Sequence, residues 1–272
     1  MVDPAWLRLR AVACAAADAG GRAALARFHA RERLAVESKS DESPVTIADR
    51  EAEAACQATI MAAYPEDAWL GEETGGRGET GAVGTRRWIV DPIDGTRNFV
   101  RGVPLWATLV ACEEVGAAGT RVVASAVAIP ALGELYDAVL GGGARLNGAA
   151  IRVSAVPTLA GALWCFEARH FWRKAGLDAL FDHLGDHTQL QRGLADAYGH
   201  MLVASGRAEI VVEPALAVWD VAATSLVVTE AGGRFSDLDG SPSIRSNNAV
   251  VSNGRVHDET LALIARLRRP SR

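Results

Sequence analysis

The sequence has few of the features that mark nucleic-acid-binding proteins. Only two of its 28 basic residues are lysine, Lys39 and Lys174, and no run of Lys or Arg is long enough to form a nucleic-acid arm. Its 33 acidic residues bring the formal net charge to −5, so the chain as a whole is not built to neutralise nucleic-acid phosphates. We therefore expect no nucleic-acid partner.

Long apolar runs are also missing. The longest strongly apolar stretches, 103–112 and 122–132, fall far short of the ~20 residues that span a bilayer. Arg8 and Arg10 precede an alanine-rich stretch, as in a signal peptide, but an amphipathic pattern continues to residue 28 and favours a helix instead. We expect a cytoplasmic protein with no membrane partner.

Cysteine is scarce and widely spaced. No two cysteines lie within forty residues of each other, so no C-x-x-C pair is available for a zinc knuckle or a thioredoxin-type motif. His183 and His187 are four residues apart, but no H-E-x-x-H motif accompanies them. We expect no zinc site and four reduced thiols, at Cys14, Cys56, Cys112 and Cys165.

The overall composition is that of an ordinary globular protein. Of the 272 residues, 49% are apolar and 22% are charged. Glycine and proline together number 37, too few for a collagen-like or low-complexity chain. At roughly 150 residues per domain, this length predicts one large or two modest domains.

The first third of the chain has helical patterning. Residues 4–34 predict one helix, with a local weakness or break at Gly20-Gly21. Residues 51–64 predict a second helix, capped by Thr46 or Asp49 and stopped by Pro65. The polar segment 37–44 between them predicts a loop, and the glycine-rich segment 75–84 predicts a flexible surface loop.

Strand patterns follow, and then strands alternate with helices. Asn147-Gly148 is a strong hairpin signal, and with four preceding strands it predicts one largely antiparallel sheet. Near Pro157 the pattern becomes α/β. We expect an α+β half over 1–153 and an α/β half over 154–272. The strands are expected at 87–90, 107–113, 122–129, 134–140, 163–166, 208–212 and 250–252, and the later helices at 172–184, 196–204, 220–231 and 259–267.

The segment 91–96 (DPIDGT) is the most informative for chemistry. An apolar strand runs into Asp91 and Asp94, and Pro92 predicts a turn that points both carboxylates into one pocket. Gly95 allows backbone to approach a ligand, and Thr96 can begin a helix whose first amides favour an anion. The pattern predicts a metal site beside a phosphate site. By itself, it also fits a helix-capping turn with solvated acids.

Other acidic residues follow apolar residues in the same way. Glu72 and Glu73 come after an apolar run at 68–70, and Asp220 opens a predicted helix. Taken singly, these fit a solvated turn and an ordinary helix cap. Grouped in one cleft, the carboxylates would repel one another unless a cation joined them, and oxygen ligands suit Mg²⁺ rather than zinc.

The chain resembles the inositol monophosphatase family. The segments that carry the resemblance occur in the family order, from about residue 43 to residue 253. It implies a layered α/β/α/β/α sandwich, Mg²⁺-dependent hydrolysis of a small phosphate monoester, and a homodimer. The matching segments are 43–49 (SPVTIAD), 71–73 (GEE), 91–96 (DPIDGT), 219–223 (WDVAA) and 230–233 (EAGG).

The resemblance also implies the metal ligands. Two or three Mg²⁺ ions are expected in each active site. Glu72, Asp91 and the carbonyl of Ile93 match the ligands of the first ion. Asp91, Asp94 and Asp220 match those of the second.

Catalytic and phosphate-binding roles carry over in the same way. Glu72 and Thr96 match the pair that orients and activates the attacking water. Asp49 matches the residue that hydrogen-bonds Thr96 or supports the metal site. Asp94, Gly95 and Thr96 match the phosphate-binding positions, where the Gly95 and Thr96 amides would hold the phosphate.

Two further segments, 98–108 (NFVRGVPLWAT) and 195–200 (ADAYGH), resemble the branch of the family that hydrolyses histidinol phosphate. The resemblance implies that Asp196 and Glu213 face the organic part of the substrate. This fits the chemistry, because histidinol phosphate carries an ammonium and an imidazole that can be cationic. That branch commonly has Gly-Asp where Ala195-Asp196 stands, so Asp196 also fits a plain helix cap.

Several alternatives stay open at this point. Within the enzyme class, an inositol monophosphatase, a broad-specificity phosphatase or an enzyme acting on a nucleotide such as phosphoadenosine phosphate would share the same motifs. In another class, a regulatory or RNA-associated protein could retain the fold. The negative net charge and the absence of a basic stripe count against the last of these.

Overall fold

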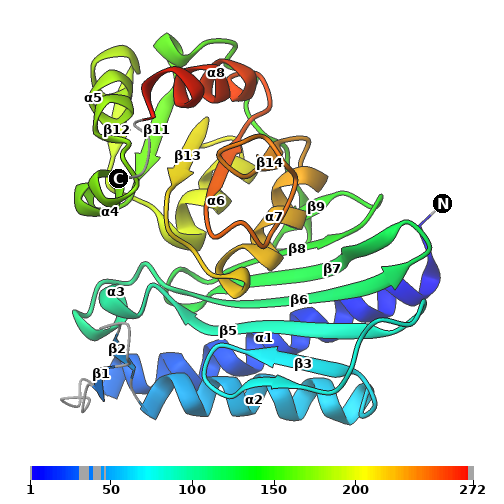
Figure 1. Cartoon of the computed structure of the whole chain (residues 1–272). Coiled ribbons are helices and arrows are strands. Elements are labelled where there is room, and N and C mark those ends of the chain that lie inside the picture. The colour runs from blue at the N-terminus through cyan, green and yellow to red at the C-terminus, as the bar shows by residue number, and fades with distance from the viewer. Residues whose placement is uncertain (1, 31–36, 39–43, 46, 269–272) are drawn as a thin grey trace.

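Two β-sheets and the helices that cover them form five successive layers (Figure 1). The computed structural model describes residues 2–30, 37–38, 44–45 and 47–268. The layers are helices α1 (Pro4–Ala30) and α2 (Ile47–Ala63), an eight-stranded sheet, helices α6 (Asp196–Ala204) and α7 (Val218–Glu230), a five-stranded sheet, and helices α4 (Arg169–Lys174), α5 (Asp178–His187) and α8 (His257–Leu267). This order confirms the expected α/β/α/β/α sandwich.

Helix α1 runs unbroken through Gly20-Gly21, so the predicted break there is wrong. Both glycines are buried in the helix. A Cβ atom at Gly20 would lie 2.4 Å from Cys56 Sγ of α2, and one at Gly21 would lie 2.7 Å from Pro130 Cγ. The two glycines therefore allow α1 to pack closely against its neighbours, and this packing outweighs their low helix propensity.

Helix α2 begins earlier than predicted, at Ile47, which places Asp49 inside its first turn rather than at its cap. Thr46, the other candidate cap, lies outside the described residues, as do residues 31–34 of the first predicted helix. Strands β1 (Glu37–Ser38) and β2 (Pro44–Val45) pair antiparallel where a loop was expected.

The eight-stranded sheet has the order β10-β9-β8-β7-β6-β5-β3-β4. Only the β3–β5 pair is parallel among the described strands of this sheet, so the largely antiparallel sheet is confirmed, as is the hairpin at Asn147-Gly148. Part of the glycine-rich segment forms β4 instead of a loop. The strands are β3 (Ala68–Gly71), β4 (Gly75–Arg77), β5 (Arg86–Asp94), β6 (Ala107–Gly116), β7 (Gly119–Ile129), β8 (Glu134–Val139), β9 (Ala144–Leu146) and β10 (Ala149–Ala150).

The five-stranded sheet has the order β12-β11-β13-β15-β14. Strand β11 is parallel to both of its neighbours, whereas β15 is antiparallel to both of its own. β12 and β14 were not predicted, because three residues are too few to show a period. The strands are β11 (Leu163–Phe166), β12 (Leu190–Arg192), β13 (Ile210–Glu213), β14 (Arg234–Ser236) and β15 (Ala249–Ser252).

The helix predicted over 172–184 is two helices, α4 and α5. The chain between them passes through Gly176, whose φ is +71°, a value that a right-handed helix cannot contain. Helix α6 begins and ends where it was predicted. Helix α7 starts two residues earlier than predicted, so Asp220 is its third residue.

The central core joins the two halves of the chain. Apolar side chains from both sheets and from α6 and α7 pack into one buried cluster, which includes Leu109 of β6, Met201 of α6, Val227 of α7 and Val251 of β15. This packing holds the first turn of α7 against the eight-stranded sheet near the end of β5 (Figure 1). The division into domains at 153/154 stays a prediction.

All four cysteines are free thiols, as expected. Within the part of the chain that the structure describes, no helix combines the length and the apolar character that crossing a membrane requires.

Candidate active site

A bulge near the end of β5 turns two aspartates toward the same face of the sheet. In a regular strand, residues three apart point to opposite faces. Here Asp91 pairs with Leu109 and Asp94 with Ala107, so three steps along β5 match two along β6. Leu109 and Ala107 both face the core between the sheets, and the bulge places both carboxylates on that face as well.

The strand therefore continues through Pro92, where the sequence predicted a turn, and ends only at Asp94. The Thr108 hydroxyl donates to the Pro92 carbonyl at 2.8 Å and satisfies a backbone group at the bulge. Helix α3 (Thr96–Val100) begins at Thr96, as predicted. Gly95 connects the two with φ +83°, a conformation that side-chain-bearing residues rarely adopt.

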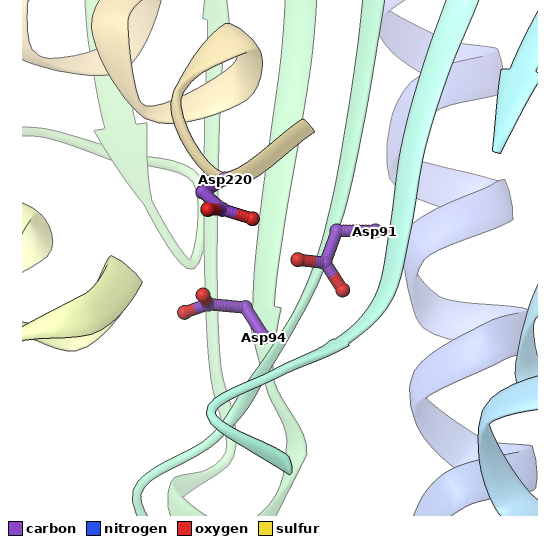
Figure 2. Close-up of side chains that lie close together, drawn as sticks. All are labelled: Asp91, Asp94 and Asp220. Carbon is purple, nitrogen blue, oxygen red and sulfur yellow. The ribbon is translucent and has the colours of Figure 1, made fainter. Parts of the chain in front are cut away.

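The third carboxylate comes from α7, more than a hundred residues further along the chain. Asp220 Oδ2 accepts a hydrogen bond from the Ala217 backbone N–H at 2.7 Å, which closes the first turn of the helix. Figure 2 shows Asp220 facing Asp91 and Asp94 across a small gap. One oxygen from each of the three carboxylates lies within 4.8 Å of the other two.

These carboxylates disfavour one another's charge. Burial, followed by the charge of Glu72 and then of Asp94, holds the pKa of Asp91 well above its usual range. Burial, followed by the charge of Asp196, does the same to the pKa of Asp94. Burial raises the pKa of Asp220 to about 7. A divalent cation would relieve this repulsion, and three carboxylate oxygen donors at this spacing fit Mg²⁺.

Glu72 lies in the turn after β3, and a buried glutamate of α2 holds that turn. The Glu72 backbone N–H donates to the Val90 carbonyl at 3.1 Å. Glu53 accepts hydrogen bonds from the backbone N–H groups of Glu73, at 2.8 Å, and Thr74, at 3.0 Å. It also accepts from the Thr74 hydroxyl at 2.5 Å. Sequence reasoning missed Glu53, although it stands one helical turn after Asp49.

A cleft of about 570 Å³ collects most of the predicted site residues. Two predicted residues, Asp49 and Glu213, are not among those that line it. Asp49 is buried in the first turn of α2. The predicted residues that do line the cleft are Glu72, Asp91, Ile93, Asp94, Gly95, Thr96, Asp196 and Asp220.

Glu213 lies buried behind Asp196. Its Oε1 accepts a hydrogen bond from the Asp196 backbone N–H at 2.9 Å, and its Oε2 lies 2.8 Å from His200 Nε2. The His200 Nδ1 lies 2.9 Å from the Thr224 hydroxyl. His200 is therefore a core residue.

The start of α6 closes the cleft on the side of the five-stranded sheet. Asp196 has φ +57°, an uncommon conformation that is found often at functional sites. The next amide, Ala197 N–H, donates to Asp94 Oδ2 at 2.7 Å. Burial and the charge of Glu213 raise the pKa of Asp196 to about 6. The hydrogen bond from Ala197 N–H to Asp94 ties the start of α6 to the end of β5.

The Thr96 hydroxyl donates to the Ile93 carbonyl at 3.0 Å, so a predicted catalytic group and a predicted metal ligand are in direct contact. A Cβ atom at Gly95 would lie 3.2 Å from the Leu105 carbonyl. The lack of a side chain at Gly95 therefore leaves room for the Leu105 carbonyl to approach the backbone beside Asp94.

Comparisons with known proteins agree with this geometry. The model of the inositol monophosphatase family matches residues 6–269. A histidinol-phosphatase of Streptomyces coelicolor is 43% identical over 254 residues, which cover 91% of this chain and 93% of that protein. An inositol-1-monophosphatase of Mesorhizobium japonicum is 34% identical, over 90% of this chain and 91% of that protein.

Among solved structures, the extragenic suppressor protein suhB from Bartonella henselae matches with a TM-score of 0.85 and 29% identity, over 94% of this chain and 98% of that one. The layered fold and the acidic cleft define a phosphatase, a hydrolase of phosphate esters. The chain belongs to the inositol monophosphatase family.

Proposed function

We propose that this phosphatase is a Mg²⁺-dependent hydrolase that converts L-histidinol phosphate and water to L-histidinol and phosphate. One observation carries the metal-dependent chemistry: the buried carboxylates of Asp91 and Asp94 on β5 and the half-buried carboxylate of Asp220 on α7 have oxygens within 4.8 Å of one another in the cleft. The substrate assignment is supported by the 43% identity to a histidinol-phosphatase, against 34% to an inositol-1-monophosphatase.

Two or three Mg²⁺ ions would be held by Glu72, Asp91, the Ile93 carbonyl, Asp94 and Asp220. When bound, Mg²⁺ supplies Lewis-acid chemistry, which lowers the pKa of a bound water and neutralises charge on the phosphoryl oxygens. This donor set has oxygen atoms only, as Mg²⁺ prefers.

The chain's own residues orient the reactants. Glu72 and Thr96 would position the attacking water, and Asp49 would support them from α2. Because α3 has only five residues, the Gly95 and Thr96 amides themselves, rather than a helix dipole, would hold the phosphate. The water oxygen bonds to phosphorus as the ester P–O bond breaks, and the departing alkoxide takes up a proton.

The acids near the start of α6 would select the organic half of the substrate. Asp196 lines the cleft and can pair with a cationic group, while Glu213 holds its backbone in place. With this substrate, the enzyme would act in histidine biosynthesis in the cytoplasm. The family resemblance supports a homodimer.

A phosphate-release assay on purified protein tests the proposal. Histidinol phosphate, myo-inositol phosphate and about a dozen other monoesters would be compared with Mg²⁺ and with excess chelator. We expect histidinol phosphate to have the highest kcat/KM and the chelator to abolish turnover. A preference for inositol phosphate would contradict the substrate, and full activity in chelator would contradict the metal-dependent chemistry.

A further inference from the structure

Glu167 is an acidic cleft residue for which the sequence predicted no role. It directly follows β11 and lines the same cleft as the metal-ligand candidates. Its side chain is half-buried, yet its carboxylate has no hydrogen-bond or ion-pair partner among the described residues. Burying a carboxylate without a partner costs free energy, so this position is unfavourable for the empty protein.

The charges around Glu167 also disfavour its ionised form. Burial, and then the charges of Glu213 and Asp196, raise its pKa to about 8, and Arg97 is the cation that opposes them. The guanidinium of Arg97 lies over the Phe171 ring, 5.4 Å from its centroid. Arg97 therefore offsets only part of the negative charge on this wall of the cleft.

Two aromatic residues line the same cleft as Glu167. Phe166 directly precedes Glu167 in the chain, and the Phe171 ring lies against Arg97. Aromatic faces attract cations and stack on planar groups. A carboxylate without a partner, in a cleft that also presents such rings, matches a ligand with a cationic group that is planar or short-chained, such as a protonated imidazole or an alkylammonium.

We propose that Glu167 is a specificity-determining residue, whose carboxylate pairs with the cationic organic group of the substrate while the phosphate lies at the Asp91–Asp94–Asp220 cluster. Glu213 is less suited to this role because both its oxygens already face Asp196 and His200. Asp196, to which the proposed function already gives a cationic partner, has its Oδ2 3.5 Å from where a Gly95 Cβ would stand, so Glu167 would be an additional acidic group for the organic half of the substrate. This inference rests on the proposed function for the identity of the substrate. It does not rest on it for the presence of a cationic group in the substrate.

Replacing Glu167 by Gln tests the proposal, because it removes the charge and keeps the shape. The measured quantity is the ratio of kcat/KM for histidinol phosphate to kcat/KM for glycerol phosphate, whose organic part is uncharged, with Mg²⁺ present. We expect this ratio to fall by about tenfold in Glu167→Gln, mainly through KM for the cationic substrate. Glu167→Asp, which keeps the charge, should recover part of the ratio.

Asp182→Asn is the matched control. Asp182 lies on α5 outside the cleft, where it pairs with Arg169, and its substitution changes the net charge equally. The ratio should stay as in the wild type. An unchanged ratio in Glu167→Gln, or an equal loss for both substrates, would overturn the proposal.

The two proposals can fail separately. If the wild type does not prefer histidinol phosphate, the substrate assignment fails, and the same variants are then assayed on phosphoethanolamine, a monoester whose organic part carries an ammonium group. A loss in Glu167→Gln confined to phosphoethanolamine would still support Glu167. If Glu167→Gln shows no selective loss on either of these two substrates, Glu167 does not determine specificity.

Discussion

Buried carboxylates at opposite ends of the strand pair β5–β6 have contrasting surroundings. Glu113, near the far end of β6, is 3% exposed and accepts hydrogen bonds from Arg245 Nη2 at 2.7 and 2.9 Å. Arg87 approaches the same carboxylate at 3.7 Å. Asp91 is equally buried, at 2% exposure, but its charged neighbours are other acids.

This difference distinguishes a carboxylate with a structural role from carboxylates with a functional one. Around Glu113 the chain provides its own cations, so the charges compensate one another in the folded protein. Around Asp91, Asp94 and Asp220 the cation has to come from solution. A cluster that lowers stability in the empty protein is the usual mark of a binding site.

The largest expected effect comes from removing one carboxylate of the cluster. In Asp94→Asn, kcat should fall by about 10³-fold, because the metal site loses a charged ligand and Ala197 N–H loses its charged acceptor. Phosphate release at saturating Mg²⁺ measures this, with Asp182→Asn as the control for net charge. Turnover above a tenth of the wild-type rate would remove Asp94 from the metal site.

The same chemical change at the other end of the strand pair should affect stability instead. In Glu113→Gln, the free energy of unfolding should fall by about 2 kcal/mol, since Arg245 and Arg87 lose their buried partner. This figure allows for solvent screening at Arg245, whose side chain is 49% exposed. Urea unfolding gives the measurement, and kcat should stay at the wild-type value. A loss of activity without a loss of stability would contradict the structural role of Glu113.

Substituting Glu53 should change the Mg²⁺ requirement of the enzyme, because Glu53 acts on Glu72 through the backbone of the turn. In Glu53→Gln, one acceptor of the turn becomes a donor that faces N–H groups. The Mg²⁺ concentration for half-maximal activity should rise by about tenfold, whereas KM for the phosphate ester at saturating Mg²⁺ should change little. Glu51→Gln on the outer part of α2, where Glu51 pairs with Arg27, is the matched control. An unchanged Mg²⁺ requirement would show that Glu53 does not position Glu72.

The smallest effect concerns the empty protein. In Asp91→Asn, the free energy of unfolding measured in excess chelator should rise by about 1 kcal/mol, because one of the repelling, desolvated charges is removed. Thermal unfolding with and without Mg²⁺ measures it. Mg²⁺ should stabilise the wild type more than the variant. A lower stability of Asp91→Asn in chelator would mean that the cluster is compensated without a metal.

Local patterns predicted much of the fold because each has a short-range cause. The boundaries of α6 and β11 follow from periodicity, and the hairpin at Asn147-Gly148 follows from its turn residues. Local patterns failed where packing opposes propensity. Gly20-Gly21 continues a helix because α2 packs too closely for a side chain at Gly20 and Pro130 packs too closely for one at Gly21.

The candidate site shows the same division. The acidic residues were recognised one by one, and the family resemblance ordered them into a site. The bulge that turns Asp94 to the same face as Asp91 has no sequence signature, because it depends on how β6 pairs with β5. Glu53 and Glu167 were missed for the same reason: their partners and surroundings come from other elements.

The amino-acid sequence alone determined which groups this protein can use: oxygen donors that follow apolar strands, a glycine that permits close approach of the backbone, and a net charge unsuited to nucleic acid. Only the tertiary structure decided which of these groups meet. Asp220 reaches Asp91 and Asp94 because a core shared by both sheets holds α7 against β5. The burial that brings the three carboxylates together also removes the water that would otherwise solvate them, so their affinity for a cation is a property of the folded chain.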